Sequence, residues 1–163
     1  PERLVVFHSL SKRSNLPGLR SGFLATGAEN IKRLSQLKSY GGAPLPKPLQ
    51  YAAAAVWSDE EHVKENRKLY AAKYKLADNI LSGLEGYTSP EAGFFLWIKV
   101  KDGEKTTLDL WRQTGVSVLP GAYLAQEKNG KNPGQDFIRV ALVAQQKVTG
   151  EALTKIRSFL EKQ

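Results

Sequence analysis

The sequence feature that most constrains the fold is a long polar stretch, residues 9–22, which lies between two short apolar runs. The apolar runs, residues 4–7 and 23–26, predict two strands, and the first strand is expected to be buried. The stretch between them contains Lys12 close to two serines and, eight residues later, Arg20. Hydroxyl groups, a backbone loop and a guanidinium suit a phosphate group, and a deprotonated lysine amine can form a Schiff base. The composition of the stretch is also typical of a basic surface loop with turn residues.

The spacing within this stretch resembles the lysine signature of the class I and II aminotransferases. In that signature, a serine three residues before the lysine and an arginine eight residues after it contact the phosphate of pyridoxal 5′-phosphate (PLP). Ser9 and Arg20 stand at these positions relative to Lys12, and the turn residues of the pattern follow as Asn-x-Pro-Gly-x-Arg-x-Gly without a gap. The resemblance implies that Lys12 is the catalytic lysine and holds PLP. It also implies that Ser9, Ser11 and Arg20 bind the cofactor phosphate.

A second arginine of interest, Arg139, lies within an apolar run at residues 137–142. An arginine in such a strand costs stability unless it is paired, although simple alternation could also turn it towards solvent. Together with residues 93–97 and 118–121, this run resembles the strands of the small domain in the same family. There an arginine binds the α-carboxylate of the substrate in a bidentate pair. The resemblance therefore implies that Arg139 is a substrate-binding residue.

Hydrophobic periodicity predicts an α/β fold. The resemblance covers essentially the whole chain and implies the C-terminal part of a PLP-dependent transferase of fold type I. Residues 1–58 would be the C-terminal part of the large PLP-binding domain, residues 59–86 a long interdomain helix, and residues 87–163 a small C-terminal α/β domain. The expected helices cover residues 28–38, 49–57, 59–84, 106–114 and 148–160, and the expected strands of the small domain lie within residues 93–100, 115–119 and 137–142.

Two helix starts and one buried face are specific enough to test. Ser58 is expected to cap the long helix, because acidic residues follow it in the first turn. Thr106 or Thr107 is expected to cap the next helix, which is expected to bury Leu108 and Trp111.

Composition excludes several classes of site and partner. The chain has no cysteine and only two histidines, which excludes disulfides and thiolate metal sites and argues against a histidine-rich metal site. The net charge of +8 raises nucleic acid as a partner, but the basic residues are spread along helical patterns and mixed with acidic ones, so we expect none. No apolar run approaches the ~18 residues of a membrane span, and no signal peptide is visible, so a cytoplasmic protein is expected. The lack of methionine and the start at Pro1 indicate a piece of a longer protein.

The resemblance also implies an activity, the transfer of an amino group between an amino acid and a keto acid, with Lys12 as the base. It implies a homodimer in the full-length protein and further cofactor-binding residues upstream of Pro1. Residues 9–23 and 52–63 are especially similar to bacterial succinyldiaminopimelate aminotransferases of lysine biosynthesis. Two other interpretations remain open. One is an aminotransferase-like effector domain of a transcriptional regulator, and the other is a basic binding module without catalysis.

Overall fold

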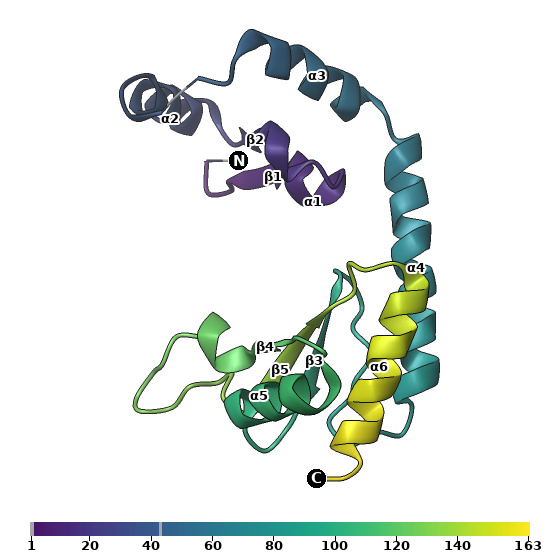
Figure 1. Cartoon of the computed structure of the whole chain (residues 1–163). Helices are drawn as coiled ribbons and strands as arrows, with labels where there is room; N and C mark the ends of the chain where they lie inside the picture. The colour runs from purple at the N-terminus through teal and green to yellow at the C-terminus, as the bar shows by residue number, and fades with distance from the viewer. Residues whose placement is uncertain (1, 43) are drawn as a thin grey trace. The chain divides into compact units, whose positions relative to one another are not determined.

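The computed structural model describes residues 2–42 and 44–163. The chain forms two compact units, Pro1–Arg67 and Lys68–Gln163, and the division between them falls inside the long helix α4 (Glu61–Leu81). We refer to them as unit 1 and unit 2 (Figure 1). The three-part division at residues 58 and 86 stays a prediction.

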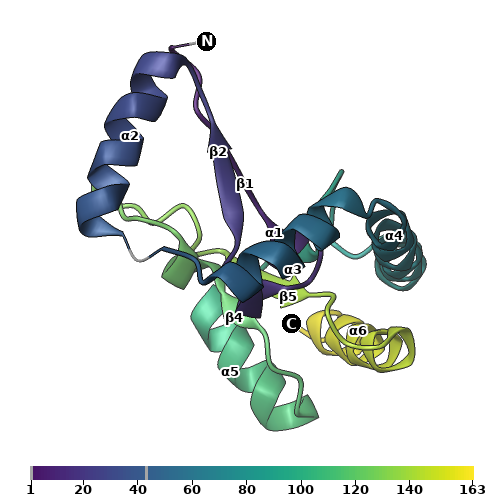
Figure 2. The same cartoon turned by 90° about the horizontal axis from the view of Figure 1, so that it is seen from above.

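Unit 1 is built on an antiparallel pair of strands, β1 (Val6–Ser9) and β2 (Gly22–Ala25). The register pairs Val6 with Ala25 and Ser9 with Gly22, so the two ends of the polar stretch are held together. A one-turn helix, α1 (Leu10–Arg13), and a 3₁₀ turn, η1 (Pro17–Leu19), fill the connection. Two longer helices, α2 (Ala28–Gly41) and α3 (Lys47–Ser58), follow β2 (Figure 2).

The expectation that the first strand is buried is wrong for this chain. Phe7 is 74% exposed and Val6 is 44% exposed, and α2 has no buried residue at all. An open groove between the strands and α2 is lined by Phe7, Phe23, Ile31 and Leu34, among others. The physical reason is that unit 1 has only two strands among its described residues, too few to enclose a core.

Unit 2 is a two-layer α/β structure, which confirms the predicted fold class. Its sheet has the order β3-β5-β4, with β3 (Phe95–Lys99) and β4 (Leu119–Pro120) both antiparallel to β5 (Phe137–Ala141). The 3₁₀ turn η2 (Gly121–Leu124) follows β4, and the helices α5 (Gly103–Thr114) and α6 (Gln146–Leu160) complete the unit. Among the described helices of the chain, none combines the length and the apolar character needed to cross a membrane.

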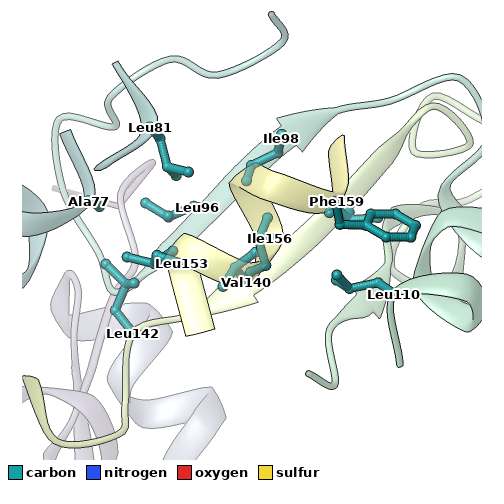
Figure 3. Close-up of a cluster of buried hydrophobic side chains, with 11 residues drawn as sticks. Ala77, Leu81, Leu96, Ile98, Leu110, Val140, Leu142, Leu153, Ile156 and Phe159 are labelled. Carbon is teal, nitrogen blue, oxygen red and sulfur yellow. The ribbon is translucent and has the colours of Figure 1, made fainter. Parts of the chain in front are cut away.

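The core of unit 2 lies between one face of this sheet and its helices (Figure 3). Strand alternation turns Ile138 and Val140 into the core and leaves Arg139 on the other face of β5. Side chains from α4, α5 and α6 cover the inner face. The buried residues are Ala77, Leu81, Leu96, Ile98, Leu110, Ile138, Val140, Leu142, Leu153, Ile156 and Phe159.

Helix α5 starts earlier than predicted. The side chain of Asp102 accepts a hydrogen bond from the backbone N–H of Lys105 at 2.9 Å, so Asp102 is the N-cap in place of Thr106 or Thr107. An aspartate satisfies the first free N–H groups of a helix as well as a threonine does.

The predicted buried face of α5 is also wrong. Leu108 and Trp111 are 44% and 58% exposed, whereas Leu110 is fully buried. The helix carries apolar side chains on both sides, and only contact with β5 and α6 decides which side is covered.

Candidate functional site

The candidate site in unit 1 begins with two hydroxyl groups at the start of α1. The Ser9 side chain caps this helix by accepting a hydrogen bond from the Ser11 N–H at 3.1 Å, and Ser9 Oγ lies 3.0 Å from Ser11 Oγ. Leu10 anchors the turn, because its side chain is fully buried and its N–H donates to the carbonyl of Ser21 at 3.1 Å. The structure therefore brings together the two serines that the spacing selected.

Lys12 lies in the same turn, three residues after the capping serine. Its side chain is exposed in this chain. The polar stretch contains two further cationic side chains, Arg13 and Arg20, and no acidic one. The charges of Lys12 and Arg20 favour a dianionic ligand such as a phosphate ester near the start of α1, whereas the charge of Arg13 is paired with Glu60.

Arg20 closes the loop with an uncommon backbone conformation. Its φ angle is 51° and its guanidinium donates to the carbonyl of Pro17 at 3.0 Å. Asn15 in the same loop also has a positive φ, 52°. A non-glycine residue in the left-handed region carries strain, and such strain is concentrated at functional sites.

Gly22 allows the two strands to approach each other below this loop. A β-carbon at Gly22 would lie 2.6 Å from the carbonyl oxygen of His8, so any larger residue would push β1 and β2 apart. The glycine at the end of the sequence signature therefore has a steric role that the structure explains.

Arg139 is placed in unit 2, on the outer face of the sheet. It is half-buried and pairs in register with Trp97 on one side and Leu119 on the other. Its guanidinium carbon lies 4.2 Å from the centre of the Phe95 ring. Among the described residues it forms no ion pair with an acidic side chain, so its donors suit an external carboxylate.

The donor set in unit 1 fits PLP chemically. Two adjacent hydroxyls and a guanidinium in one loop match a phosphate, and a primary amine in the same turn matches an aldehyde. Ser9, Ser11, Lys12 and Arg20 all belong to this loop, and Arg139 belongs to the other unit. The roles assigned to these five residues stay predictions.

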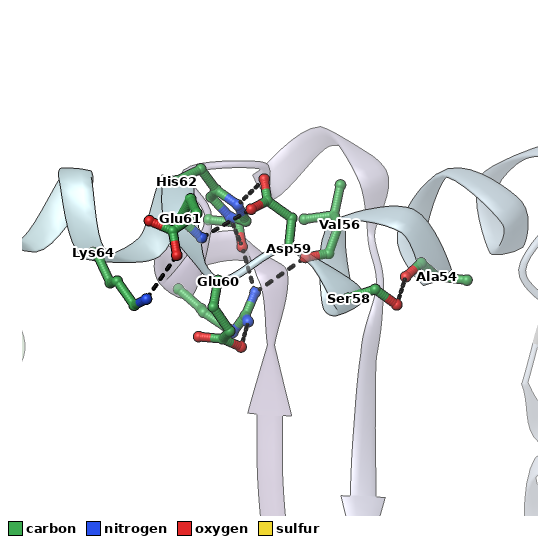
Figure 4. Close-up of polar contacts among 10 residues, drawn as sticks. Ala54, Val56, Ser58, Asp59, Glu60, Glu61, His62 and Lys64 are labelled. Carbon is green, nitrogen blue, oxygen red and sulfur yellow. Dashed lines mark hydrogen bonds and ion pairs between the residues drawn. The ribbon is translucent and has the colours of Figure 1, made fainter.

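Sequence reasoning missed a polar cluster at the joint between α3 and α4, where Figure 4 shows Asp59, Glu60 and His62. The expected cap, Ser58, is instead the last residue of α3, and Asp59 accepts the backbone N–H of Glu61 at 2.9 Å. This cluster contacts α1 through residues far away in the sequence, so no local spacing could have revealed it.

The sequence is similar to a known protein family and to individual members of it. The pattern of the family described as aminotransferase class I and II matches residues 1–156. The chain is 32% identical over 143 residues to the 4-dedimethylamino-4-oxo-anhydrotetracycline transaminase of Streptomyces rimosus, covering 86% of this chain and 38% of that protein. It is also 32% identical to LL-diaminopimelate aminotransferase 2 of Nostoc sp., covering 94% of this chain and 39% of that protein. The chain thus spans about two fifths of the length of these relatives.

Solved structures agree with these relatives. An aminotransferase from Neisseria meningitidis superposes with a TM-score of 0.92 at 40% identity, covering 98% of this chain and 41% of that one. A probable N-succinyldiaminopimelate aminotransferase from Thermus thermophilus superposes with a TM-score of 0.80 at 29% identity, covering 97% and 42%. These similarities confirm the predicted fold, a part of the PLP-dependent transferase fold type I.

Proposed function

This chain belongs to the class I and II aminotransferases, and we propose that the full-length protein transfers an amino group between an amino acid and a keto acid with PLP as its cofactor. The observation that carries the proposal is the loop of unit 1, where Lys12 follows two joined serine hydroxyls at the spacing of the family signature. When bound, PLP supplies an electron sink for the electron pair left on the substrate when its Cα–H bond breaks.

The residues of unit 1 would hold the cofactor and move one proton. Ser9 and Ser11 donate their hydroxyls to the phosphate, and Arg20 supplies a guanidinium that neutralises its charge. The Nζ atom of Lys12, in its neutral form, would take the proton from the substrate Cα and would then deliver it to the C4′ carbon of the cofactor, so that the proton changes carbon during the half-reaction. Because Lys12 stands on a turn capped by Ser9, the base and the phosphate ligands keep a fixed spacing.

Arg139 would orient the substrate. Its two terminal nitrogens donate a parallel pair of hydrogen bonds to the α-carboxylate. The ring of Phe95, 4.2 Å away, holds the guanidinium by a cation–π contact, which leaves the edge of its plane for the carboxylate. Fixing the carboxylate fixes the direction of the Cα–H bond, which decides which bond the base can reach.

Three further features belong to the same proposal. Residues 1–58 would complete the large PLP-binding domain, residues 59–86 would form the interdomain helix, and residues 87–163 would form the small domain. The full-length protein would be a homodimer. These features are typical of the family, and we propose them on that ground.

The substrate we propose is N-succinyl-LL-diaminopimelate, an amino acid of the lysine pathway. One similarity supports it directly, the Thermus thermophilus structure described as a probable N-succinyldiaminopimelate aminotransferase. The relatives described as LL-diaminopimelate aminotransferases support the diaminopimelate part of the substrate but not the succinyl group. Both substrates carry an α-carboxylate for Arg139 and differ in the group on the distant amine.

The first experiment replaces Lys12 with alanine in the full-length protein. Treatment of the wild type with borohydride should attach the cofactor covalently to the peptide that contains Lys12, as read by mass spectrometry. Lys12→Ala should lose this attachment, the visible absorbance of the bound cofactor and the turnover. The matched control is Lys64→Ala, since the Lys64 side chain is 61% exposed and forms an ion pair with Glu61 on its own helix. Attachment at another lysine would refute the role of Lys12.

The second experiment tests the substrate. N-Succinyl-LL-diaminopimelate and LL-diaminopimelate are compared as amino donors to 2-oxoglutarate, by kcat/KM. A preference of about tenfold or more for the succinylated donor, about 1.4 kcal/mol in transition-state binding, would support the proposal. A preference for the free diamine would move the substrate to LL-diaminopimelate and leave the aminotransferase proposal intact.

A further inference from the structure

Helix α1 cannot hold its own shape. It has four residues, one turn, and isolated helices shorter than ~12 residues are marginal in water. The two residues that follow Lys12 are nonetheless well buried. The side chain of Arg13 is 9% exposed and Ser14 is 8% exposed. Successive side chains of a helix point about 100° apart, so the burial of Arg13 turns Lys12 outward.

Arg13 makes three contacts with the joint between α3 and α4, and a fourth with its neighbour Ser14. Its Nη1 donates to the carbonyl of Val56 at 3.4 Å and to Ser14 Oγ at 3.1 Å. Its Nη2 forms an ion pair with Glu60. Its guanidinium carbon lies 5.0 Å from the centre of the Trp57 ring. A lysine could not reproduce this set, because the contacts use two nitrogens and the flat face of one guanidinium.

Ser14 is held by a second chain of hydrogen bonds. His62 Nε2 lies 2.8 Å from Ser14 Oγ, and His62 Nδ1 lies 2.8 Å from Asp59 Oδ2. The ionised Asp59 only accepts, so the Nδ1–H of His62 donates to it. The other ring nitrogen, Nε2, forms the hydrogen bond with the Ser14 hydroxyl. Ser14 Oγ in turn accepts a hydrogen bond from Arg13 Nη1, so the series Arg13–Ser14–His62–Asp59 is connected by hydrogen bonds throughout.

The order serine, histidine, aspartate is also that of a hydrolase triad, but the surroundings of Ser14 exclude that use. Its oxygen is buried and already accepts a hydrogen bond from Arg13. Its backbone N–H donates to the carbonyl of Leu10 and so closes α1. The hydroxyl is therefore a structural link between α1 and α4.

We propose that Arg13 and Ser14 are positioning residues that fix the amine of Lys12 by tying α1 to the α3–α4 joint. The inference rests on the proposed function, because it assigns a role relative to the base of that reaction. The joint is itself held in place, because Trp57 packs against Phe23 and His8 of the two strands at ring-centre distances of 5.0 and 5.4 Å. The joint that holds Arg13 and Ser14 is thus itself packed against the strand pair.

The test uses the full-length protein loaded with PLP and the variants Arg13→Met and Ser14→Ala. A misplacement of the base by about 1 Å can cost up to ~100-fold in rate, so Arg13→Met should lower kcat by tenfold or more. KM for the amino donor should change by less than about threefold, because Lys12 acts on the bound substrate. Borohydride should still attach the cofactor at Lys12, and the visible absorbance of the bound cofactor should shift.

The control variant is Arg112→Met. Arg112 is also a helical arginine with an acidic partner, Asp109 at 3.7 Å, but its side chain is 65% exposed and it lies in unit 2. It should keep kcat, KM and the spectrum of the wild type. A loaded Arg13→Met protein with kcat within about twofold of the wild type would overturn the inference, and so would a rise in KM at constant kcat.

Ser14→Ala decides the matter if Arg13→Met does not fold. It removes one hydroxyl and leaves every contact of Arg13 with Val56, Glu60 and Trp57 in place. A fall in kcat of about threefold or more at constant KM supports the inference, and an unchanged kcat overturns it. A wild-type protein that binds no PLP and transfers no amino group would instead overturn the proposed function, and this inference with it.

Discussion

The turn between α4 and β3 offers a matched pair of substitutions, Gly83→Ala and Gly86→Ala. Both glycines have a positive φ, 75° and 82°. They differ in their surroundings. A β-carbon at Gly83 would have no atom within 4 Å, whereas at Gly86 it would lie 2.3 Å from the carbonyl oxygen of Lys99. The pair therefore separates the cost of the backbone conformation from the cost of a steric clash.

The two costs can be estimated separately. Alanine in the left-handed region costs about 1 kcal/mol, and this is the whole effect expected for Gly83→Ala. At Gly86 the added carbon also forces apart two backbone segments that are joined by the Lys99 N–H to Gly86 carbonyl hydrogen bond at 2.9 Å. The steric clash and the weakening of that bond together add about 1–3 kcal/mol, so Gly86→Ala should cost about 2–4 kcal/mol in total.

Hydrogen exchange of the β5 backbone amides measures this difference, because these amides lie in the core strand of unit 2 and exchange when the unit opens. Each 1.4 kcal/mol lost from the free energy of unfolding speeds exchange about tenfold. Gly86→Ala should therefore exchange about tenfold faster than Gly83→Ala, or more. Equal exchange rates in the two variants would refute the steric argument and reduce both effects to backbone strain.

Two other predictions concern the same chain. Leu110→Ala should lower the free energy of unfolding of unit 2 by about 3 kcal/mol, because the Leu110 side chain is fully buried. Leu108→Ala should lower it by under ~0.5 kcal/mol, because Leu108 is 44% exposed. A urea titration measures both values, and the reverse order would contradict the assignment of Leu110 to the core. The pKa of Asp59 is lowered from its ordinary value of 3.8 by the hydrogen bonds from His62 and from the Glu61 N–H. The stabilisation by Asp59 should thus be present above that value and be lost as the pH falls through the lower pKa of the folded state. Melting temperatures of the wild type and Asp59→Asn should converge in acid, and parallel curves would exclude this linkage.

The sequence predicted the fold well where hydrophobic patterns are local and one-sided. The alternation around Arg139 is present in the structure, and the helix predicted at residues 148–160 is confirmed as α6. The prediction failed for α5, whose apolar residues lie on both sides, because tertiary contacts select the buried side. It also failed for the burial of the first strand, because burial depends on what covers a strand as well as on its composition.

The candidate site likewise has one part that could be predicted from local sequence and one part that could not. Ser9, Ser11, Lys12 and Arg20 lie within one loop, so their spacing carries the signal, and the structure joins the two serines directly. The cluster that supports Lys12 links Ser14 to His62, which are 48 residues apart. Such a contact depends on the packing of α1 against the α3–α4 joint. A single sequence contains no periodicity or spacing that encodes it.

The open strand pair of unit 1 has a consequence for handling this chain on its own. Among the described residues of this unit, β1 and β2 pair only with each other, and Phe7 and Phe23 are 74% and 48% exposed beside them. Free strand edges next to apolar side chains can recruit strands of other molecules. A preparation of this chain alone is therefore expected to associate through β1 and β2, and a protein surface that pairs with these edges would suppress that association.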